Sequence, residues 1–415
     1  MIRSITLLGS SSGRNAGDAA LLSSIMESVD DACGSKLLYE IPTLKPEFIW
    51  NTYHNRVRPV CILPWNFSAK LFGIPTIRSL LRTNMSLVFD ATLFDRSLYN
   101  PFFNFLSSYY LMLPLAKKRG KKMACYTVSI GPVSTQKGKD MLRTVLELME
   151  FISVRDQDAI DMLREVGVQN PNVIITNDAA LNTKPSSPKR VESVWQQLGL
   201  AEHREVLAIN VNPYFDSWAG LRRNPLSREQ FISAYVRGLK RALGDLDVNV
   251  MFVVTQHLDL SLTKEIMNRL ETRHKKVLFS NTEYSHHDIK GVMGKASLLF
   301  AMRLHCLILT SSALTPICSL NYLPKVTTYL KSLGLSDYAL SFENFNEEAI
   351  GTHIVRAWND RALIRRRLEE LIPSMQHEAN KAAELVAVMH RGEDVSAALE
   401  RLRLEPSNIR MAHAG

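Results

Sequence analysis

Residues 297–309 read SLLFAMRLHCLIL, an apolar run that contains one arginine, Arg303, and one histidine, His305. The pattern predicts a buried strand, the two polar residues at its carboxyl end, and then a helix. Burying an unpaired guanidinium is costly, so Arg303 must face an acidic partner, a cleft or a ligand. Two interpretations stay open from this stretch alone: a ligand site, or a core histidine beside an internal ion pair.

The segment that follows continues the same pattern. Ala313–Leu320 predicts a short strand, and the loop after it carries Lys325. In open α/β sheets, ligands bind beyond the carboxyl ends of the strands. We therefore expect Arg303, His305 and Lys325 to lie along one edge of a sheet.

The bulk composition is that of a globular protein with two domains. The chain has 415 residues, of which 46% are hydrophobic and 22% charged. Its five cysteines are odd in number and show no CxxC spacing, which favours reduced thiols in the cytoplasm over disulfides or a zinc site. The first nine residues predict a strand and a glycine loop, not a signal peptide. The apolar stretch 101–116 is too short and too interrupted to cross a bilayer.

The chain is basic, with a formal net charge of +9. Such a charge suits an anionic ligand, an anionic membrane face or nucleic acid, and the absence of any nucleic-acid motif argues against the last. A basic cluster at 117–122 directly follows the apolar stretch. One interpretation is a helix end whose lysines complement the dipole. The other is a patch that contacts the inner face of the membrane, in a protein that serves a lipid-linked acceptor.

Apolar strands alternate with amphipathic helices along most of the chain, which predicts α/β domains with doubly wound parallel sheets. A stretch rich in proline, serine and charge predicts a linker. The predicted division is a first domain over 1–184, a linker over 185–195, a second domain over 196–343, and C-terminal helices and tail over 344–415. Packing of those helices back on the first domain is one option.

Polar residues follow the predicted strands of both sheets. In the first sheet they are Asn15, Asp18, Asp90, Arg155 and Asp178, and in the second they are Asn210, Gln256, His257, Arg303, His305 and Lys325. The cations suit a substrate with phosphate and carboxylate groups, and the Asp and His side chains suit general acid–base chemistry. No cluster has metal-ligand spacing and no G-x-S-x-G is present, so neither a metal site nor a serine hydrolase is expected. We expect the His286-His287 pair to be exposed.

Four short motifs, in this order, resemble those of the polysaccharide pyruvyl transferases. They are the N-x-G-D-x-x-L pattern at Asn15–Leu21, the S-x-R-D pattern at Ser153–Asp156, the D-x-A pattern at Asp178–Ala180 and the R-x-H pattern at Arg303–His305. Pro316 and the run Tyr322–Val326 match the continuation. One departure lies after Asp90, where the family has glycines and this chain has Ala91-Thr92. The backbone cannot approach a ligand as closely there, which leaves acceptor specificity open.

The resemblance implies two Rossmann-like domains in a GT-B-like arrangement. It implies phosphoenolpyruvate as donor on the C-terminal domain and, on the N-terminal domain, a nucleotide- or lipid-linked sugar of an exopolysaccharide or cell-wall glycan. The product would be a pyruvate ketal, with no cofactor and no metal. In this scheme His305 is the general acid/base and Asp18 activates the acceptor hydroxyl. The expected substrate-binding residues are Arg303, Lys325, Arg155, Asn15, Gly17, Asp178, Gln256 and His257.

Two alternatives from other classes remain. A nucleotide-sugar glycosyltransferase of GT-B type would also need a basic cleft. A non-catalytic homologue in a polysaccharide assembly complex would explain the altered Ala91-Thr92 loop. The sequence leaves the oligomeric state open, with a homo-oligomer as one option.

Overall fold

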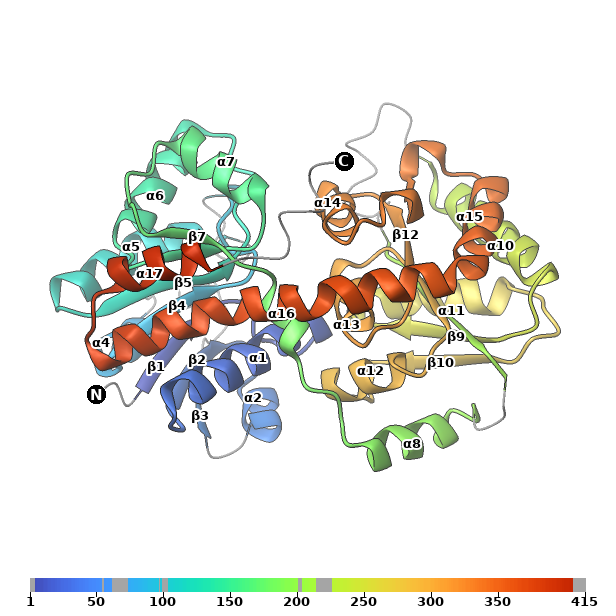
Figure 1. Cartoon of the computed structure of the whole chain (residues 1–415), viewed down its shortest axis with the longest axis horizontal. Coiled ribbons are helices and arrows are strands. Elements are labelled where there is room, and N and C mark those ends of the chain that lie inside the picture. Colours follow the sequence, from blue (N-terminus) through green and yellow to red (C-terminus); the bar gives the residue numbers. More distant parts are fainter. Residues whose placement is uncertain are drawn as a thin grey trace. The chain divides into compact units, whose positions relative to one another are not determined.

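The chain forms two compact α/β units (Figure 1). The computed structural model describes residues 4–53, 56–61, 74–96, 98, 104–200, 204–213 and 226–405. Within those ranges, unit 1 contains residues up to 13, residues 21–182 and residues from 375 on, and unit 2 contains residues 14–20 and 183–374. None of the described helices is long and apolar enough to cross a membrane.

Unit 1 is built on a seven-stranded sheet in which every neighbouring pair is parallel. The strand order is β3-β2-β1-β4-β5-β6-β7. The strands are β1 (Ser4–Leu8), β2 (Leu38–Thr43), β3 (Val57–Cys61), β4 (Met85–Phe89), β5 (Lys122–Val128), β6 (Ile152–Val154) and β7 (Val173–Ile175). Central strands such as β4 are buried along their whole length, as their unbroken apolar sequence predicts.

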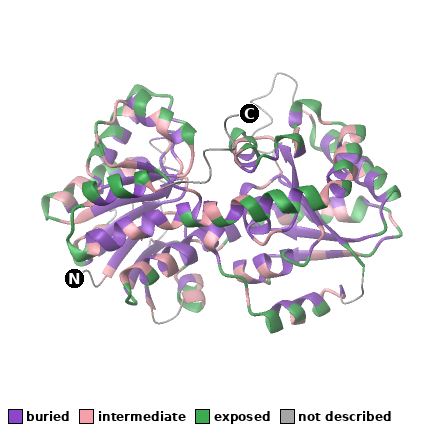
Figure 2. Ribbon diagram, viewed as in Figure 1, coloured by how far each residue is buried: buried purple, intermediate pink, exposed green. Residues whose placement is uncertain are grey.

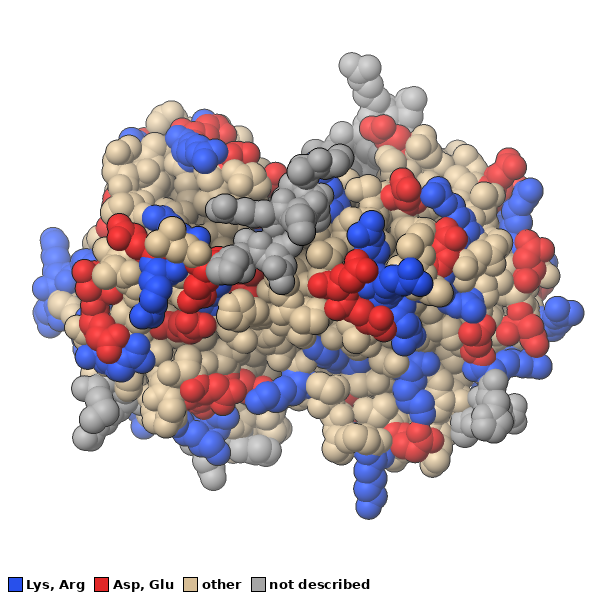
Figure 3. All heavy atoms as spheres, viewed as in Figure 1, with Lys and Arg blue, Asp and Glu red and all other residues tan. Residues whose placement is uncertain are grey.

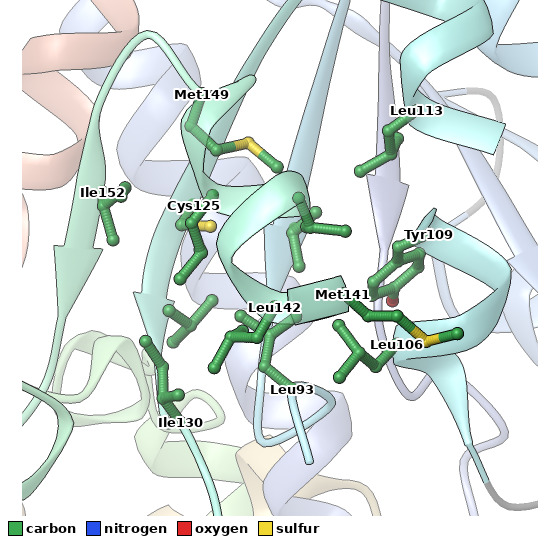
Figure 4. Packing of buried hydrophobic residues seen from close by; sticks show 14 of the residues in the cluster. Leu93, Leu106, Tyr109, Leu113, Cys125, Ile130, Met141, Leu142, Met149 and Ile152 are labelled. Atoms are coloured by element: carbon green, nitrogen blue, oxygen red, sulfur yellow. The ribbon is translucent and has the colours of Figure 1, made fainter. Parts of the chain in front are cut away.

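Helices connect these strands. They are α1 (Ala16–Cys33), α2 (Pro46–Tyr53), α4 (Ile74–Arg82), α5 (Phe105–Lys118), α6 (Gln136–Glu147), α7 (Gln157–Val166) and the short η2 (Ala179–Asn182). Leu106 and Tyr109 of α5 pack with Met141 and Leu142 of α6 in the core over β5 (Figure 4). Most of the apolar stretch 101–116 lies in α5, which begins at Phe105 after the capping residue Asn104, and residues 101–103 lie outside the described ranges.

Unit 2 repeats the architecture with six parallel strands in the order β10-β9-β8-β11-β12-β13. The strands are β8 (Val206–Asn210), β9 (Asn249–Val254), β10 (Lys276–Ser280), β11 (Leu298–Ala301), β12 (Ile317–Asn321) and β13 (Ala339–Ser341). Each half of the chain thus contains the 3-2-1-4-5-6 strand order of a Rossmann fold. The predicted fold class, α/β with two Rossmann-like parallel-sheet domains, is confirmed.

The helices of unit 2 follow its strands, and the C-terminal helices complete the chain. They are α8 (Pro188–Gln197), α10 (Arg228–Gly244), η4 (His257–Asp259), α11 (Leu260–Arg269), α12 (His286–Met293), α13 (Leu304–Ser311), α14 (Pro324–Ser332), η5 (Ser336–Tyr338), η6 (Phe342–Asn344), α15 (Glu347–Asn359), α16 (Arg361–Arg391) and α17 (Val395–Leu404). From Met375 on, α16 and α17 belong with unit 1, where Gln376 Nε2 donates to the carbonyl of Leu181 at 2.9 Å.

The stretch 185–195, which the sequence predicts to be a linker without regular structure, is helical from Pro188 on, where α8 begins. Ser187 caps this helix by accepting from the backbone N–H of Arg190, and proline is well suited to the first helical position. Val191 and Trp195, four residues apart, are buried on one face. A serine–proline pair therefore starts a helix here.

Among the predicted C-terminal helices, α16 is continuous through Pro373. A proline inside a helix removes one backbone hydrogen bond and strains the preceding turn. Ile364, Leu368, Ile372 and Met375 are all buried and continue one apolar stripe across the proline. Their burial offsets the local cost of the proline.

Helix α12 is largely buried (Figure 2), and His286 at its start is buried too, contrary to the expectation that it is exposed. Its neighbour His287 is only partly exposed, and its Nδ1 lies 2.6 Å from the carbonyl oxygen of Lys184. Burial lowers the pKa of His286 to about 3. The imidazole is therefore neutral in the folded protein at all ordinary pH values.

Gly238 in the middle of α10 allows α15 to pack closely. A Cβ at this position would lie 2.6 Å from Cβ of Ile350 and 3.1 Å from the carbonyl of Glu347. Gly238→Ala should destabilise the protein by about 1–3 kcal/mol through overpacking. Gly244→Ala, in the same helix but with open space around it, should be neutral or stabilise by up to about 1 kcal/mol. Denaturant unfolding of both variants tests the pair, and equal effects would contradict the packing argument.

Acid should weaken the protein through His286. Its folded pKa lies below the value of about 6.5 in the unfolded chain, so the unfolded state binds the proton first as pH falls. Stability should therefore fall between about pH 6.5 and pH 3, by about 2 kcal/mol from this residue between pH 7 and 5. Urea unfolding of His286→Leu should show a shallower loss than wild type, whereas the exposed control His377→Gln should not. Identical slopes for wild type and His286→Leu would refute this.

Candidate functional site

Polar side chains of unit 2 gather where β8 and β11 lie side by side. The connections of the sheet reverse direction between these two strands, which is where open α/β sheets bind ligands. Asn210 ends β8 and joins its neighbours: its Oδ1 accepts from the backbone N–H of Arg303 at 3.0 Å, and its Nδ2 donates to the carbonyl of Val253 at 2.9 Å. Asn210 thereby holds the start of the Arg303–His305 segment.

Arg303 follows β11 and immediately precedes α13, as the sequence predicts. Its Nε donates to Oδ2 of Asp259 at 2.9 Å and its Nη2 donates to Oδ1 at 2.5 Å. The Asp259 side chain is 0% exposed, while that of Arg303 is 27% exposed. Burial raises the pKa of Asp259, and the ion pair with Arg303 opposes that rise. The acidic partner that Arg303 requires is thus supplied from within unit 2.

A segment from the N-terminus of the chain completes this edge. Residues 14–20 belong to unit 2: the N–H of Ala16 donates to the carbonyl of Thr255 at 2.8 Å, and Asn15 pairs with Gln256 as an isolated antiparallel bridge. Asn15 Nδ2 also donates to Oδ1 of Asp18 at 2.6 Å. The predicted residues Asn15, Asp18 and Gln256 are therefore brought together.

Gly17 and His305 are in direct contact. A Cβ at Gly17 would lie 2.2 Å from the imidazole of His305, so only glycine leaves room for the ring. The N–H of Gly17 donates to Oδ1 of Asn15 at 2.9 Å, which fixes the glycine in place. The two separate motifs that contain Gly17 and His305 thus meet at one point.

Lys325 and His257 lie at the exposed part of this edge. Lys325 is in the first turn of α14 and not in a loop as predicted, because Pro324 occupies the first helical position. Just before it, Tyr322 accepts a hydrogen bond at 2.7 Å from Nδ2 of Asn212, and burial raises the pKa of Tyr322 to about 12. The backbone N–H of His257 donates to the carbonyl of Arg14 at 2.9 Å.

Arg155 and Asp178 form a second cluster, in unit 1. Arg155 Nη1 donates to Oδ2 of Asp178 at 3.0 Å, and its Nε lies 3.5 Å from Oδ2 of Asp156. All three side chains are largely buried. Asp178 also accepts from the N–H of Ala180. Arg155 and Asp178, which the sequence predicts to bind substrate, therefore pair with each other inside unit 1.

Sequence reasoning missed Asp259, Asn212 and Tyr322 as members of the site. The signal for Asp259 was the arginine itself, since a buried guanidinium calls for a carboxylate. Several acids follow strands, however, and the sequence does not say which one is paired. The described residues contain no group of three or more His, Cys, Asp or Glu side chains that could hold a metal ion.

The sequence matches a protein-family model over most of its length. Residues 15–324 match the model of a family described as polysaccharide pyruvyl transferase. No curated protein matches the sequence. The matched range begins at Asn15 and includes every residue of the edge described above except Arg14 and Lys325.

Solved structures share the fold at low sequence identity. Anabaena HepE in complex with UDP and glucose is 11% identical, with a TM-score of 0.54 over 97% of this chain and 98% of its own. Neisseria meningitidis UDP-GlcNAc 2-epimerase bound to UDP-GlcNAc is 12% identical, with a TM-score of 0.59 over 94% and 100%. S. aureus MnaA with UDP is 9% identical, with a TM-score of 0.59 over 98% and 99%. The fold is GT-B-like.

Removing the cation of the buried pair should destabilise unit 2. Arg303→Met leaves the Asp259 carboxylate buried without its partner, which should cost about 3–5 kcal/mol at pH 7. The loss should be smaller at pH 5, because burial already raises the pKa of Asp259 and the unpaired carboxyl becomes protonated. Urea unfolding at both pH values measures this.

The control is Arg269→Met, which removes a surface pair with Glu229 and should cost about 1 kcal/mol or less. A cost for Arg303→Met that is equal to the control, or independent of pH, would contradict the pairing.

Proposed function

Because the chain belongs to the polysaccharide pyruvyl transferase family, whose members modify polysaccharides, we propose that its donor is phosphoenolpyruvate. The enolpyruvyl group passes to two hydroxyls of a sugar in a nucleotide- or lipid-linked glycan precursor. One observation carries the proposal: the contact of Gly17 with His305 places an imidazole beside the Asn15–Asp18 segment and two residues from Arg303.

The chemistry needs a group that moves protons. A proton adds to C3 of phosphoenolpyruvate and one sugar hydroxyl forms a bond to C2. The second hydroxyl then bonds to C2 as the bond from C2 to the phosphate oxygen breaks. One of the two hydroxyl protons balances the proton gained at C3, and the other leaves with phosphate. His305 is the proposed acid/base, since imidazole exchanges protons near neutral pH.

The anionic groups of the donor need positive charge at the same edge. Within the described residues, Nη1 of Arg303 forms no hydrogen bond, so one arm of the guanidinium is available to a phosphate or carboxylate oxygen. Helices α13 and α14 both begin at this edge without a side-chain cap, and helix N-termini bind anions. Lys325, exposed in the first turn of α14, adds an ammonium group.

Asp18 is the proposed group that orients or activates an acceptor hydroxyl. Its carboxylate is buried and is held by Asn15 at 2.6 Å, which fixes its direction. Arg155 and Asp178 are left out of the proposed donor site, because Arg155 is enclosed by two carboxylates within unit 1. Gln256 and His257 remain proposed substrate contacts through their position beside Asn15.

Purified protein should release phosphate from phosphoenolpyruvate only when a suitable nucleotide- or lipid-linked sugar is present. His305→Gln should lower kcat by about 10²–10⁴-fold, the usual contribution of a general acid/base. Its thermal midpoint should change little, because glutamine is smaller than the ring and keeps Gly17 clear. A phosphate-release assay over a panel of acceptors measures this, with the exposed His377→Gln as control.

Three outcomes would overturn the proposal. Near-normal turnover of His305→Gln would remove the assigned role. Binding of a UDP-sugar with no turnover of phosphoenolpyruvate would favour a nucleotide-sugar enzyme, since solved proteins of this fold hold UDP. No thermal shift with phosphoenolpyruvate or any sugar nucleotide would favour a non-catalytic role.

A further inference from the structure

Helix α5 of unit 1 exposes large apolar side chains. Its inner face packs in the core through Leu106 and Tyr109 (Figure 4). On its outer face Leu111 is 60% and Leu115 48% exposed, and Tyr110 is also exposed. Each of the other described helices exposes at most one large hydrophobic side chain. The outer face of α5 is therefore unusual for this protein.

Basic side chains continue this apolar face. Leu111, Leu115 and Lys118 are spaced four and three residues apart, so they share one face of the helix. Lys118 and Arg119 are exposed, and in the described part of the chain neither side chain forms an ion pair or hydrogen bond. We call Tyr110, Leu111, Leu115, Lys118 and Arg119 the α5 patch.

The chain around this patch is depleted of acids. From residue 48 to residue 139 there are thirteen lysines and arginines but only two acidic residues, Asp90 and Asp95. Both acids are buried, so they do not neutralise the surface. The excess of positive charge in this stretch is larger than the net charge of +9 of the whole chain. Basic residues are thus in excess along this stretch of the sequence, although several of them, including Arg56, Arg82 and Lys117, pair with acids outside it.

Helix α4 also exposes an apolar and a basic side chain and lacks acidic residues. It packs against α5. Its residues Ile74 and Arg78, one helical turn apart, are both exposed. By contrast, the exposed face of α16 carries arginines and glutamates side by side (Figure 3), including the ion pair Arg367–Glu370.

We propose that the α5 patch docks unit 1 on a bilayer that contains anionic phospholipid. Leu111 and Leu115 would enter the boundary between headgroups and acyl chains, while Lys118 and Arg119 contact lipid phosphates. A soluble polyanion would use the cations but not the leucines. A second copy of this chain would cover the leucines but would bring like charges together.

The proposal is independent of the proposed donor, because binding to lipid needs no substrate. If phosphoenolpyruvate is the donor, docking would bring the enzyme to a lipid-linked acceptor, where two-dimensional confinement raises the effective acceptor concentration.

Flotation of the full-length protein with vesicles tests the proposal. Wild type should float with phosphatidylglycerol-containing vesicles and not with phosphatidylcholine vesicles, and binding should weaken as salt rises. Lys118→Gln/Arg119→Gln should weaken binding by about fivefold per residue. Leu111→Gln/Leu115→Gln should weaken it by about tenfold or more while the thermal midpoint is unchanged, since both side chains are already exposed.

The matched control is Arg365→Gln/Arg366→Gln with Leu363→Gln on α16, which removes exposed groups of the same kinds and should leave flotation unchanged.

Equal binding to both vesicle types, or equal loss in the control, would overturn the proposal. So would a wild-type dimer in sedimentation that Leu111→Gln/Leu115→Gln dissociates, or equal binding of a soluble anionic polysaccharide by wild type and the leucine variant. Phosphate release from phosphoenolpyruvate in the presence of a soluble acceptor should be the same in all these variants, which separates failure of docking from failure of the activity.

Discussion

The buried carboxylate of Asp259 is the constraint on which the candidate site depends. A carboxylate that is 0% exposed needs a cation, and Arg303 supplies it through Nε and Nη2. This pairing and the hydrogen bond from the Arg303 backbone to Asn210 fix the chain where α13 begins. His305, two residues on, is then placed against Gly17, where a larger residue cannot fit. All of these contacts lie within unit 2.

Parallel topology explains why residues so distant in sequence meet. All strands of a parallel sheet end at one edge, and the order of unit 2 puts β8, β11 and β12 next to one another at the point where the connections reverse. The same order in unit 1 brings Arg155 and Asp178 together after β6 and β7. There the guanidinium is enclosed by two carboxylates, whereas Arg303 keeps one nitrogen and part of its surface open. The same strand order therefore gives an enclosed arginine, Arg155, in unit 1 and a partly accessible arginine, Arg303, in unit 2.

The parts of the fold that sequence predicts well are those decided locally. Apolar runs such as the one before Arg303 become buried strands, and the polar residues after them mark the edge. What escapes prediction depends on tertiary partners. Nothing near His286 in sequence shows that it is buried. In α16, the apolar face that continues across Pro373 keeps the helix intact although proline disfavours a helix interior. From the sequence, Asn15 and Asp18 go with the first strand, yet the hydrogen bond from Ala16 to Thr255 joins their segment to unit 2.

The same reasoning separates two sources of positive charge. A net charge of +9 suggests that the site is strongly basic. However, Arg303 and Arg155 are both neutralised by carboxylates, so the site contributes little to the excess. Among the described residues around α4 and α5, Arg78, Lys118 and Arg119 are exposed cations that form no ion pair. Salt screens the net charge of a distant surface, whereas backbone dipoles and one open guanidinium arm act over a few ångströms. An anionic substrate must therefore be bound by short-range hydrogen-bond donors at the site. These are Nη1 of Arg303, the ammonium group of Lys325 and the first turns of α13 and α14.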